Sequence, residues 1–477
     1  MSAALRVAKD EWRYWLRSKL ALAVVGLFVL ILLAVSLLNA VRMHEESHQR
    51  AHHQTDSEQT FLSQPDRHPH RMVHYGHYVF RAPMPLALFD PGLDSVTGQT
   101  MFLEGHRQNS ATFSATSGSA DLGGLSWLTP AMIFQIFAPL LIIVLGHSAV
   151  VREREARTLA TLLAQGVSGR ALLVGKLLAL LLFVALLLLP LIVSAAFSLG
   201  RGESLSTASF MVGVYFVYLA VWVGLTLLAS ALLQQRSSVI ASLAAAWLVL
   251  TLVLPAVAVN VSSQIAPLAG KIETELTMLT EVRDVGDGHD VDDSVYNNVE
   301  ASLLEEYGVD RIEDLEINIR GVLAQNAEAD LTDTLNVYAE RRMNAEAHQA
   351  ALLGWHGWLT PTLAVADASR ALAGTDLAHY HRFLRQAEDL RIGFVQSLNR
   401  VHAEELSYID DINRNRDEES WERARVAATN WQLDEFQFQP ASTSTRIANA
   451  GSSVSMLLTW LAALIALLLW NGGRLKP

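Results

Sequence analysis

The sequence of 477 residues contains no cysteine. This absence excludes disulfide bonds, thiol nucleophiles and cysteine-ligated metal centres. The chain also has fewer positive than negative residues, with 36 Lys and Arg against 48 Asp and Glu, so its formal net charge is −12. Such a balance argues against a nucleic-acid partner. No small-residue cleavage site follows the first apolar stretch, so we interpret that stretch as a retained membrane span rather than a signal peptide.

Charged residues are missing from the long apolar stretches as well. Six stretches are each long enough to cross the roughly 30 Å hydrocarbon core of a bilayer, and we predict spans at 20–41, 127–151, 177–199, 210–233, 239–261 and 454–470. Ion-coupled carriers keep ionisable groups in the membrane to bind and release the coupling ion. We therefore expect that this chain does not energise transport itself. His147, the one histidine in these spans, is expected to make a polar contact near the interface rather than to relay protons.

A nucleotide-binding loop is also missing. The nearest imitation, GRALLVGK at 169–176, has its glycines one residue too far apart, and Leu177 stands where a P-loop needs Ser or Thr. If ATP drives this protein, the ATPase is a separate polypeptide, and no cofactor is expected in this chain.

The basic residues that are present predict the topology. They flank the spans at the N-terminal segment, in the 151–176 loop, before the fifth span and in the tail, and the positive-inside rule places these parts in the cytoplasm. We predict an all-α integral membrane protein with both termini cytoplasmic. Besides the six spans, its cytoplasmic parts are an amphipathic interfacial helix at 1–19, a loop at 152–176 and a tail at 471–477. Pro139 predicts a kink in the second span, and the third and fifth spans contain Pro190 and Pro255.

Two inserts then lie outside the cytoplasm. The first, 42–126, is rich in Pro and Gly and predicts irregular structure with a short strand around 75–80. The second, 262–453, shows apolar residues at helical spacing and predicts a mostly helical domain. Thr360-Pro361 and residues 373–376 predict helix boundaries in this domain, the second with an N-cap residue before a new helix.

Between the second and third spans lies VREREARTLATLLAQGVSGRALLVGK, residues 151–176, which we call the polar segment. It opens with alternating charge, continues as a short amphipathic helix, breaks at Gly166 and restarts at Ser168. It is too polar to cross a bilayer and too short to be a domain. We expect a short helix along the membrane face that a soluble partner can reach.

This segment, the amphipathic start and the six spans resemble the ABC-2-type ABC transporter permeases. The matching residues are Glu153, Glu155, Thr158, Leu159, Leu162, Leu163, Val167, Ser168, Leu172, Gly175 and Lys176. Ala156-Arg157 and Gly166 depart from the family's usual pattern. The two large inserts are similar to those of a bacterial branch of that family, which implies a location in the bacterial inner membrane.

The resemblance implies the membrane subunit of an exporter, which works as a dimer of two copies or of sister permeases. Two cytoplasmic ATPase subunits would bind ATP and Mg, and the polar segment would dock on them as a coupling helix. The residues implied in this coupling are Arg152, Glu153, Arg154, Glu155, Thr158, Leu159 and Leu162. A solvated membrane-surface face is the plainer explanation of the same charges. The resemblance leaves the substrate open, and the outer inserts would shape an exit path or bind a periplasmic partner.

Histidine is concentrated in the first insert, where His44, Glu45 and His48 formally match the zinc-protease pattern H-E-x-x-H. Incidental metal binding fits this very polar stretch better than proteolysis. His74 and His77 are further candidate ligands, although a packing or capping role is favoured. Two alternatives to an exporter therefore stay open: a membrane zinc protease, and an ATPase-driven scaffold that transmits force without cargo.

Overall fold

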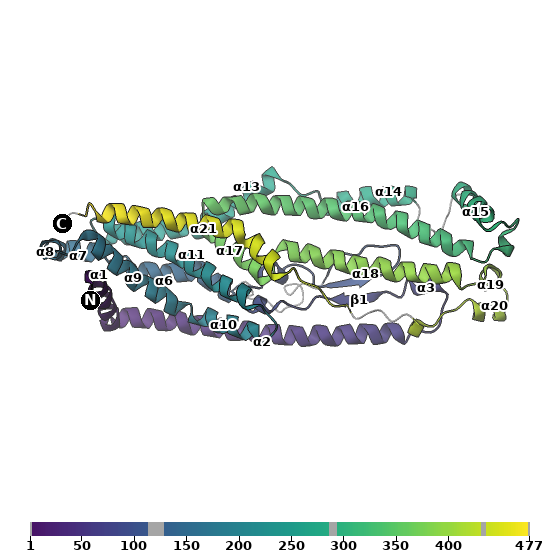
Figure 1. Cartoon of the computed structure of the whole chain (residues 1–477), viewed down its shortest axis with the longest axis horizontal. Helices are drawn as coiled ribbons and strands as arrows, with labels where there is room; N and C mark the ends of the chain where they lie inside the picture. The colour runs from purple at the N-terminus through teal and green to yellow at the C-terminus, as the bar shows by residue number, and fades with distance from the viewer. Residues whose placement is uncertain (1, 113–127, 286–292, 431–435, 476–477) are drawn as a thin grey trace.

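One helix, α2 (Lys19–Leu62), runs along most of the length of the molecule. The computed structural model describes residues 2–112, 128–285, 293–430 and 436–475. Both chain ends lie at one end of the elongated structure, which we call the termini end (Figure 1). The described parts of the two inserts, 42–112, 262–285, 293–430 and 436–453, extend to the other end, and we call them the outer domain. Residue 127, the predicted start of the second span, lies outside the described residues, as does 113–126 of the first insert.

Among the described residues, six helical stretches are long and apolar enough to cross a membrane, which confirms the predicted all-α membrane class. The first, fourth and sixth spans are single helices: α2, α11 (Leu205–Leu232) and α21 (Thr443–Gly472). The second span combines α5 (Pro130–Met132), η3 (Ile133–Phe137), α6 (Ala138–Gly146) and α7 (Val151–Glu155). The third combines α9 (Gly169–Leu187) with α10 (Leu189–Leu199), and the fifth combines α12 (Arg236–Leu248), η4 (Val249–Val253) and α13 (Leu254–Ile265). They pack around a shared core, to which α11 contributes Tyr215, Tyr218 and Trp222, all fully buried.

Three of these spans are interrupted, each close to a proline. A π-helical turn, η3 (Ile133–Phe137), precedes Pro139, and a second, η4 (Val249–Val253), precedes Pro255. The third span breaks between α9 and α10 beside Pro190. Proline removes a backbone donor and clashes with the preceding turn, so the helix changes its hydrogen bonding there.

The helices are longer than the apolar stretches, and they include charged residues that we did not expect to be buried in the bundle. Helix α21 begins at Thr443, so that it includes Arg446, which is 4% exposed. The guanidinium of Arg446 donates two hydrogen bonds of 2.9 Å to the carboxylate of Glu203, in the loop before α11. It also donates to the carbonyl of Leu372 on α17 (Pro361–Ala373). This ion pair connects three parts of the chain at the end of the bundle away from the termini.

The first insert is only partly irregular. Residues 42–62, for which we expected little helix, continue α2, because charges of opposite sign pair one turn apart along it: Glu46 contacts Arg42 at 3.6 Å and Arg50 at 3.0 Å. The predicted strand is present as β1 (His77–Phe80), which pairs antiparallel with β2 (Thr100–Leu103). Short helical turns complete the insert: α3 (Pro69–Met72), η1 (Pro85–Leu88) and η2 (Gly92–Ser95).

The second insert is mostly helical, as predicted. Its two longest helices, α16 (Ile319–Trp355) and α18 (Leu377–Glu404), lie side by side along the outer domain (Figure 1). Both predicted boundaries are present, since α17 begins at Pro361 and Asp376 caps the N-terminus of α18. The remaining elements are α14 (Lys271–Val285), α15 (Asp293–Tyr307), η5 (Ile312–Asp314), η6 (His356–Trp358), α19 (Tyr408–Asn413), α20 (Glu418–Arg423) and η7 (Ala428–Asn430).

Substituting Arg446 by Met tests the ion pair at the outer end of the bundle. The change leaves the carboxylate of Glu203 buried without its partner, which costs about 3–5 kcal/mol. We expect the free energy of unfolding in detergent to fall by that amount. The control is Arg385→Met, which removes an exposed ion pair with Glu340 and costs about 1 kcal/mol or less. Equal losses in the two variants would contradict this role for Arg446.

Candidate functional site

The polar segment lies at the termini end, together with both chain ends (Figure 1). It forms two short helices, α7 (Val151–Glu155) and α8 (Thr158–Ala164), and α9 then begins after the N-cap Ser168. Arg157, at φ 58°, separates the two helices, and Gly166, at φ 86°, ends the second. A left-handed backbone suits Gly and is uncommon for other residues. The break at Gly166 and the restart at Ser168 are therefore where the sequence placed them.

A carboxylate from the N-terminal helix α1 (Ala3–Arg17) organises the charges of this segment. Glu11 is 1% exposed, and its Oε2 accepts hydrogen bonds from Arg152 Nη2, at 2.9 Å, and from Lys176 Nζ. Lys176 also lies 3.3 Å from Glu153. We call these four residues the Glu11 network. It joins α1, α7 and α9 through two anions and two cations.

Glu11 was not among the residues predicted for the site. A signal for it exists, because Ala8, Glu11 and Trp15 recur at helical spacing on the side of α1 that packs against the bundle. An acidic residue on an otherwise apolar stripe needs a buried cation. The sequence alone did not show which cation, since Lys176 lies 165 residues away.

Gly175 explains how α1 comes so close to α9. A Cβ atom at this position would lie 2.6 Å from the carbonyl oxygen of Ala4 and 2.6 Å from Cβ of Val7. Only glycine permits this approach, and the approach brings Glu11 within reach of the neighbouring Lys176. The Gly-Lys pair of the family pattern thus has a packing role for one residue and an electrostatic role for the other.

The remaining charges of α7 bind the turn between α11 and α12. Arg154 donates to the carbonyls of Leu233, at 2.6 Å, and Ala231, at 2.9 Å, at the C-terminus of α11. Glu155 accepts from the backbone N–H of Arg236, at 2.8 Å, at the N-terminus of α12. The helix dipole favours both contacts, because a cation lies at the C-terminus of α11 and an anion at the N-terminus of α12. Helix α7 therefore holds the second, fourth and fifth spans together.

Helix α8 presents the outward face of the polar segment. Leu159 is buried and Leu162 is half-buried, whereas the exposed positions are Arg157, Thr158, Ala160, Thr161, Ala164 and Gln165. The hydroxyl of Thr158 donates a hydrogen bond of 2.7 Å to the carboxylate of Glu153. Of the residues implied in coupling, Arg152, Glu153, Arg154 and Glu155 thus contact other elements of this chain, and α8 supplies most of the accessible surface.

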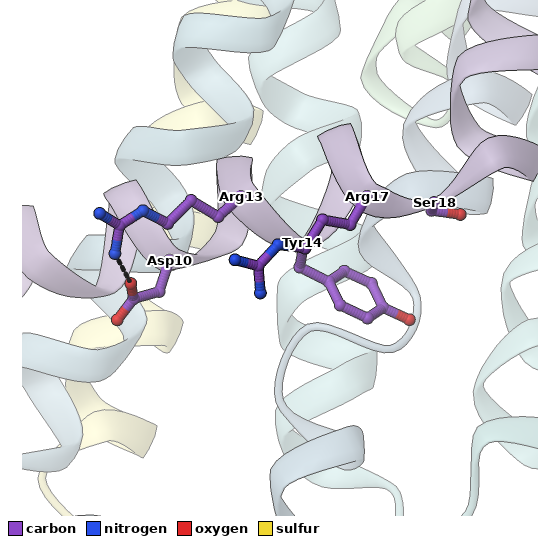
Figure 2. Close-up of a pocket in the computed structure, with 5 residues that line it drawn as sticks. All are labelled: Asp10, Arg13, Tyr14, Arg17 and Ser18. Carbon is purple, nitrogen blue, oxygen red and sulfur yellow. Dashed lines mark hydrogen bonds and ion pairs between the residues drawn. The ribbon is translucent and has the colours of Figure 1, made fainter.

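An open hollow borders α1 next to this site. It is lined by Asp10, Arg13, Tyr14, Arg17 and Ser18 (Figure 2). Asp10 and Arg13 form an ion pair of 3.2 Å. The guanidinium of Arg152 lies 3.9 Å from the centre of the Tyr14 ring, so the hollow adjoins the polar segment. Basic and aromatic side chains of this kind gather at membrane interfaces.

The histidine candidates are dispersed. His44 and His48 meet edge to face on α2, with ring centres 4.5 Å apart. His77 is buried on β1 beside Phe61, and burial lowers its pKa to about 4. Among the described residues, two groups of three could hold a metal ion, His70 with His74 and His106, and His68 with His402 and Asp411. Of the candidate ligands His44, His48, His74 and His77, only His74 belongs to either group. Among the described residues, His44 and His48 have no third ligand close enough to complete a metal site.

The spans and the polar segment together define a multi-pass membrane protein built like the permease subunit of a transporter. The chain belongs to the ABC-2 family of transporter proteins, because the model of that family matches residues 5–285, more than half of the sequence. A second family model, for a domain of unknown function (DUF3526), matches residues 272–439 and covers most of the second insert. No match was found among curated proteins. The family implies a permease rather than a catalytic subunit, with an ABC ATPase as its partner.

Replacing Gly175 by Ala tests the packing of α1 on α9. The added Cβ would push α1 away and separate Glu11 from Lys176, and overpacking of this kind costs about 1–3 kcal/mol. We expect a lower thermal midpoint in detergent and faster tryptic cleavage at Arg13 and Arg17. The control is Gly213→Ala on α11, where no atom lies within 4 Å of the added Cβ. If the two variants behave alike, the close approach does not hold α1 in place.

Proposed function

We propose that this protein is the permease subunit of an ABC exporter and that the exposed face of α8 receives the ATPase. The proposal rests on the exposure of α8 and on the contacts of its neighbour α7. Helix α8 is exposed on one side, while α7 beside it is joined by ion pairs and hydrogen bonds to α1, α9, α11 and α12. A partner that displaces α8 would therefore displace several spans together.

The charges of α7 have a different role in this proposal from the one the family resemblance implies. Arg152, Glu153 and Arg154 are engaged within the chain, so they position the segment and transmit its movement. Docking contacts come instead from exposed residues of α8, such as Thr161 and Gln165. Thr158 belongs to both groups, because it is exposed and also contacts Glu153.

The proposed orientation follows from charge. The basic residues of α1, the polar segment and the tail are at the termini end, and the positive-inside rule favours that end for the cytoplasm. The ATPase would then bind at α8 from the cytoplasm of a bacterial cell, and the outer domain would lie in the periplasm. The bilayer surrounds the spans, and no nucleic acid is involved.

A dimer of permeases is part of the proposal. In the fifth span only 17% of the apolar window is buried within the chain, against 67% in the fourth. Lipid covers some of this surface, and a second permease, identical or a sister subunit, would cover the rest. Substrate would pass between the two bundles.

The second candidate function is force transmission without cargo, and the length of α2 favours it. This helix has 44 residues, which at 1.5 Å per residue makes it about 66 Å long. It connects the termini end directly to the outer domain, so that ATP-driven motion would reach a periplasmic partner. Transport of a labelled substrate in reconstituted vesicles separates the two candidates.

Thr161→Arg tests the docking surface. We expect this change, which places a long charged side chain on the exposed face of α8, to abolish copurification of an ABC ATPase with the full chain from native membranes. Thr280→Arg on the exposed face of α14 makes the same chemical change in the outer domain and should leave copurification intact.

The anchors of α7 give a different result. We expect charge reversal at Glu153 and Glu155 to leave membrane insertion and ATPase copurification in place but to abolish the stimulation of ATP hydrolysis. Normal copurification with Thr161→Arg would refute α8 as the docking surface, and normal stimulation in the reversed variant would refute transmission through α7.

A further inference from the structure

Three histidines converge in the outer domain, and we propose that they bind a transition-metal ion of the Zn²⁺ class. His70 lies in α3, His74 follows one turn later, and His106 lies in a turn after β2. We call them the histidine triad. This site is independent of ATPase docking and transport, since it lies in the outer domain rather than at the termini end.

The three imidazoles form a nearly regular triangle. Their ring centres are 5.4 Å apart for His70 and His74, 5.4 Å for His70 and His106, and 5.2 Å for His74 and His106. One nitrogen from each ring lies within 4.8 Å of the others. A tetrahedral site with Zn–N bonds of about 2.0–2.1 Å needs nitrogens about 3.3 Å apart. Binding of the ion would draw the three nitrogens together by up to about 1.5 Å.

The backbone around the triad is built to hold His106. This residue has φ 63°, a left-handed conformation uncommon for a residue with a side chain. The N–H of the preceding Gly105 donates 2.9 Å to the carbonyl of Val73, next to His74. The turn that carries His106 is therefore attached to the segment that carries the other two ligands.

A buried carboxylate orients His106. The Nδ1 atom of His106 lies 2.8 Å from Oε2 of Glu328, whose side chain is fully buried on α16. Metal-binding histidines commonly contact a carboxylate through the other ring nitrogen, which fixes the ring and makes it a better ligand. In this arrangement Nε2 is the ligand atom of His106.

Glu328 is itself held in place by an ion pair. Arg391 on α18 donates 2.7 Å to its Oε1 and 3.3 Å to the carbonyl of Glu104, two residues before His106. The carboxylate behind the triad is thus held by a guanidinium that also contacts the chain next to His106.

The other group of potential ligands is chemically unsuited to a dication. His68, His402 and Asp411, the Asp411 cluster, are all buried, but Asp411 already contacts Arg414 and lies 3.9 Å from Arg320. These guanidinium groups supply the positive charge that a metal would bring. The Asp411 cluster connects the two inserts instead.

Exposure and ligand type indicate which ion the triad takes. His74 is exposed and the other two are half-buried, so an ion can enter from solvent. Three imidazole ligands suit Zn²⁺ or Cu²⁺ rather than Mg²⁺ or Ca²⁺, which prefer oxygen ligands. Three protein ligands leave the fourth position of a tetrahedral ion for water or an incoming group.

The test is a metal titration of the full chain in detergent, with the affinity tag removed and metal stripped by a chelator. Isothermal titration with Zn²⁺ gives affinity and stoichiometry, and Co²⁺ reports tetrahedral nitrogen ligation through its visible absorption. We expect one site per chain that His74→Ala weakens by at least about tenfold, since even loss of an outer partner of a metal ligand costs 10–100-fold. His74 is exposed, so this variant keeps the fold.

The matched control is the double variant His44→Ala, His48→Ala. It also removes exposed histidines one turn apart, but on α2, and should leave the site unchanged. Three results would overturn the proposal: no binding of Zn²⁺ or Co²⁺ by the wild type, unchanged affinity in His74→Ala, or loss of the site in the control. A thermal midpoint raised by Zn²⁺ in the wild type, and not in His74→Ala, would support it independently.

Discussion

Two cations converge on Glu11, a carboxylate almost completely removed from solvent at the termini end. A buried charge is tolerated only when it is paired, and removal of a partner leaves an uncompensated charge behind. Because Arg152 belongs to α7 and Lys176 to α9, α1 cannot separate from the bundle without exposing all three. The amphipathic helix, the polar segment and the third span therefore behave as one unit, and Gly175 supplies the close packing that this unit requires.

The other end of the bundle is joined by polar contacts of the same kind. Glu203 and Arg446 pair beside the carbonyl of Leu372. Asp90 accepts a hydrogen bond from the hydroxyl of Ser369, to which Tyr215 also donates, and burial raises the pKa of Asp90. Apolar packing has little direction, whereas these contacts have one geometry. They specify how α17 lies against α11 and α21, and so how the outer domain is seated on the bundle.

The sequence was most informative where a feature is local. Apolar stretches, N-caps such as Asp376 and breaks such as Gly166 act through neighbouring residues, and the predicted spans and boundaries followed from them. Glu11 and Arg446 could not be placed in the same way, because each is explained by a partner more than a hundred residues away.

His74 was noticed as a possible ligand, but His70 and His106 were not joined to it, since only the hairpin and the contact with Glu328 bring them together. The continuation of α2 through 42–62 was overlooked because its polar composition hid a regular pattern of ion pairs.

The spans fall into two sets, and the division suggests where movement is absorbed. The second, third and fifth spans are interrupted near Pro139, Pro190 and Pro255, and each of them meets the polar segment directly or through Glu155 and Arg236. The helices α2, α11 and α21 contain no proline and run without interruption, and α2 and α21 continue toward the outer domain. A displacement of α8 would therefore first move the spans that can bend. The straight helices α11 and α21 would pass this movement to the outer domain, because α17 packs against both of them. The Asp411 cluster joins the first insert to the second, and the contact of Glu328 with Arg391 joins α16 to α18, so the outer domain is held together as one body. It would therefore move with the bundle whether or not a substrate passes.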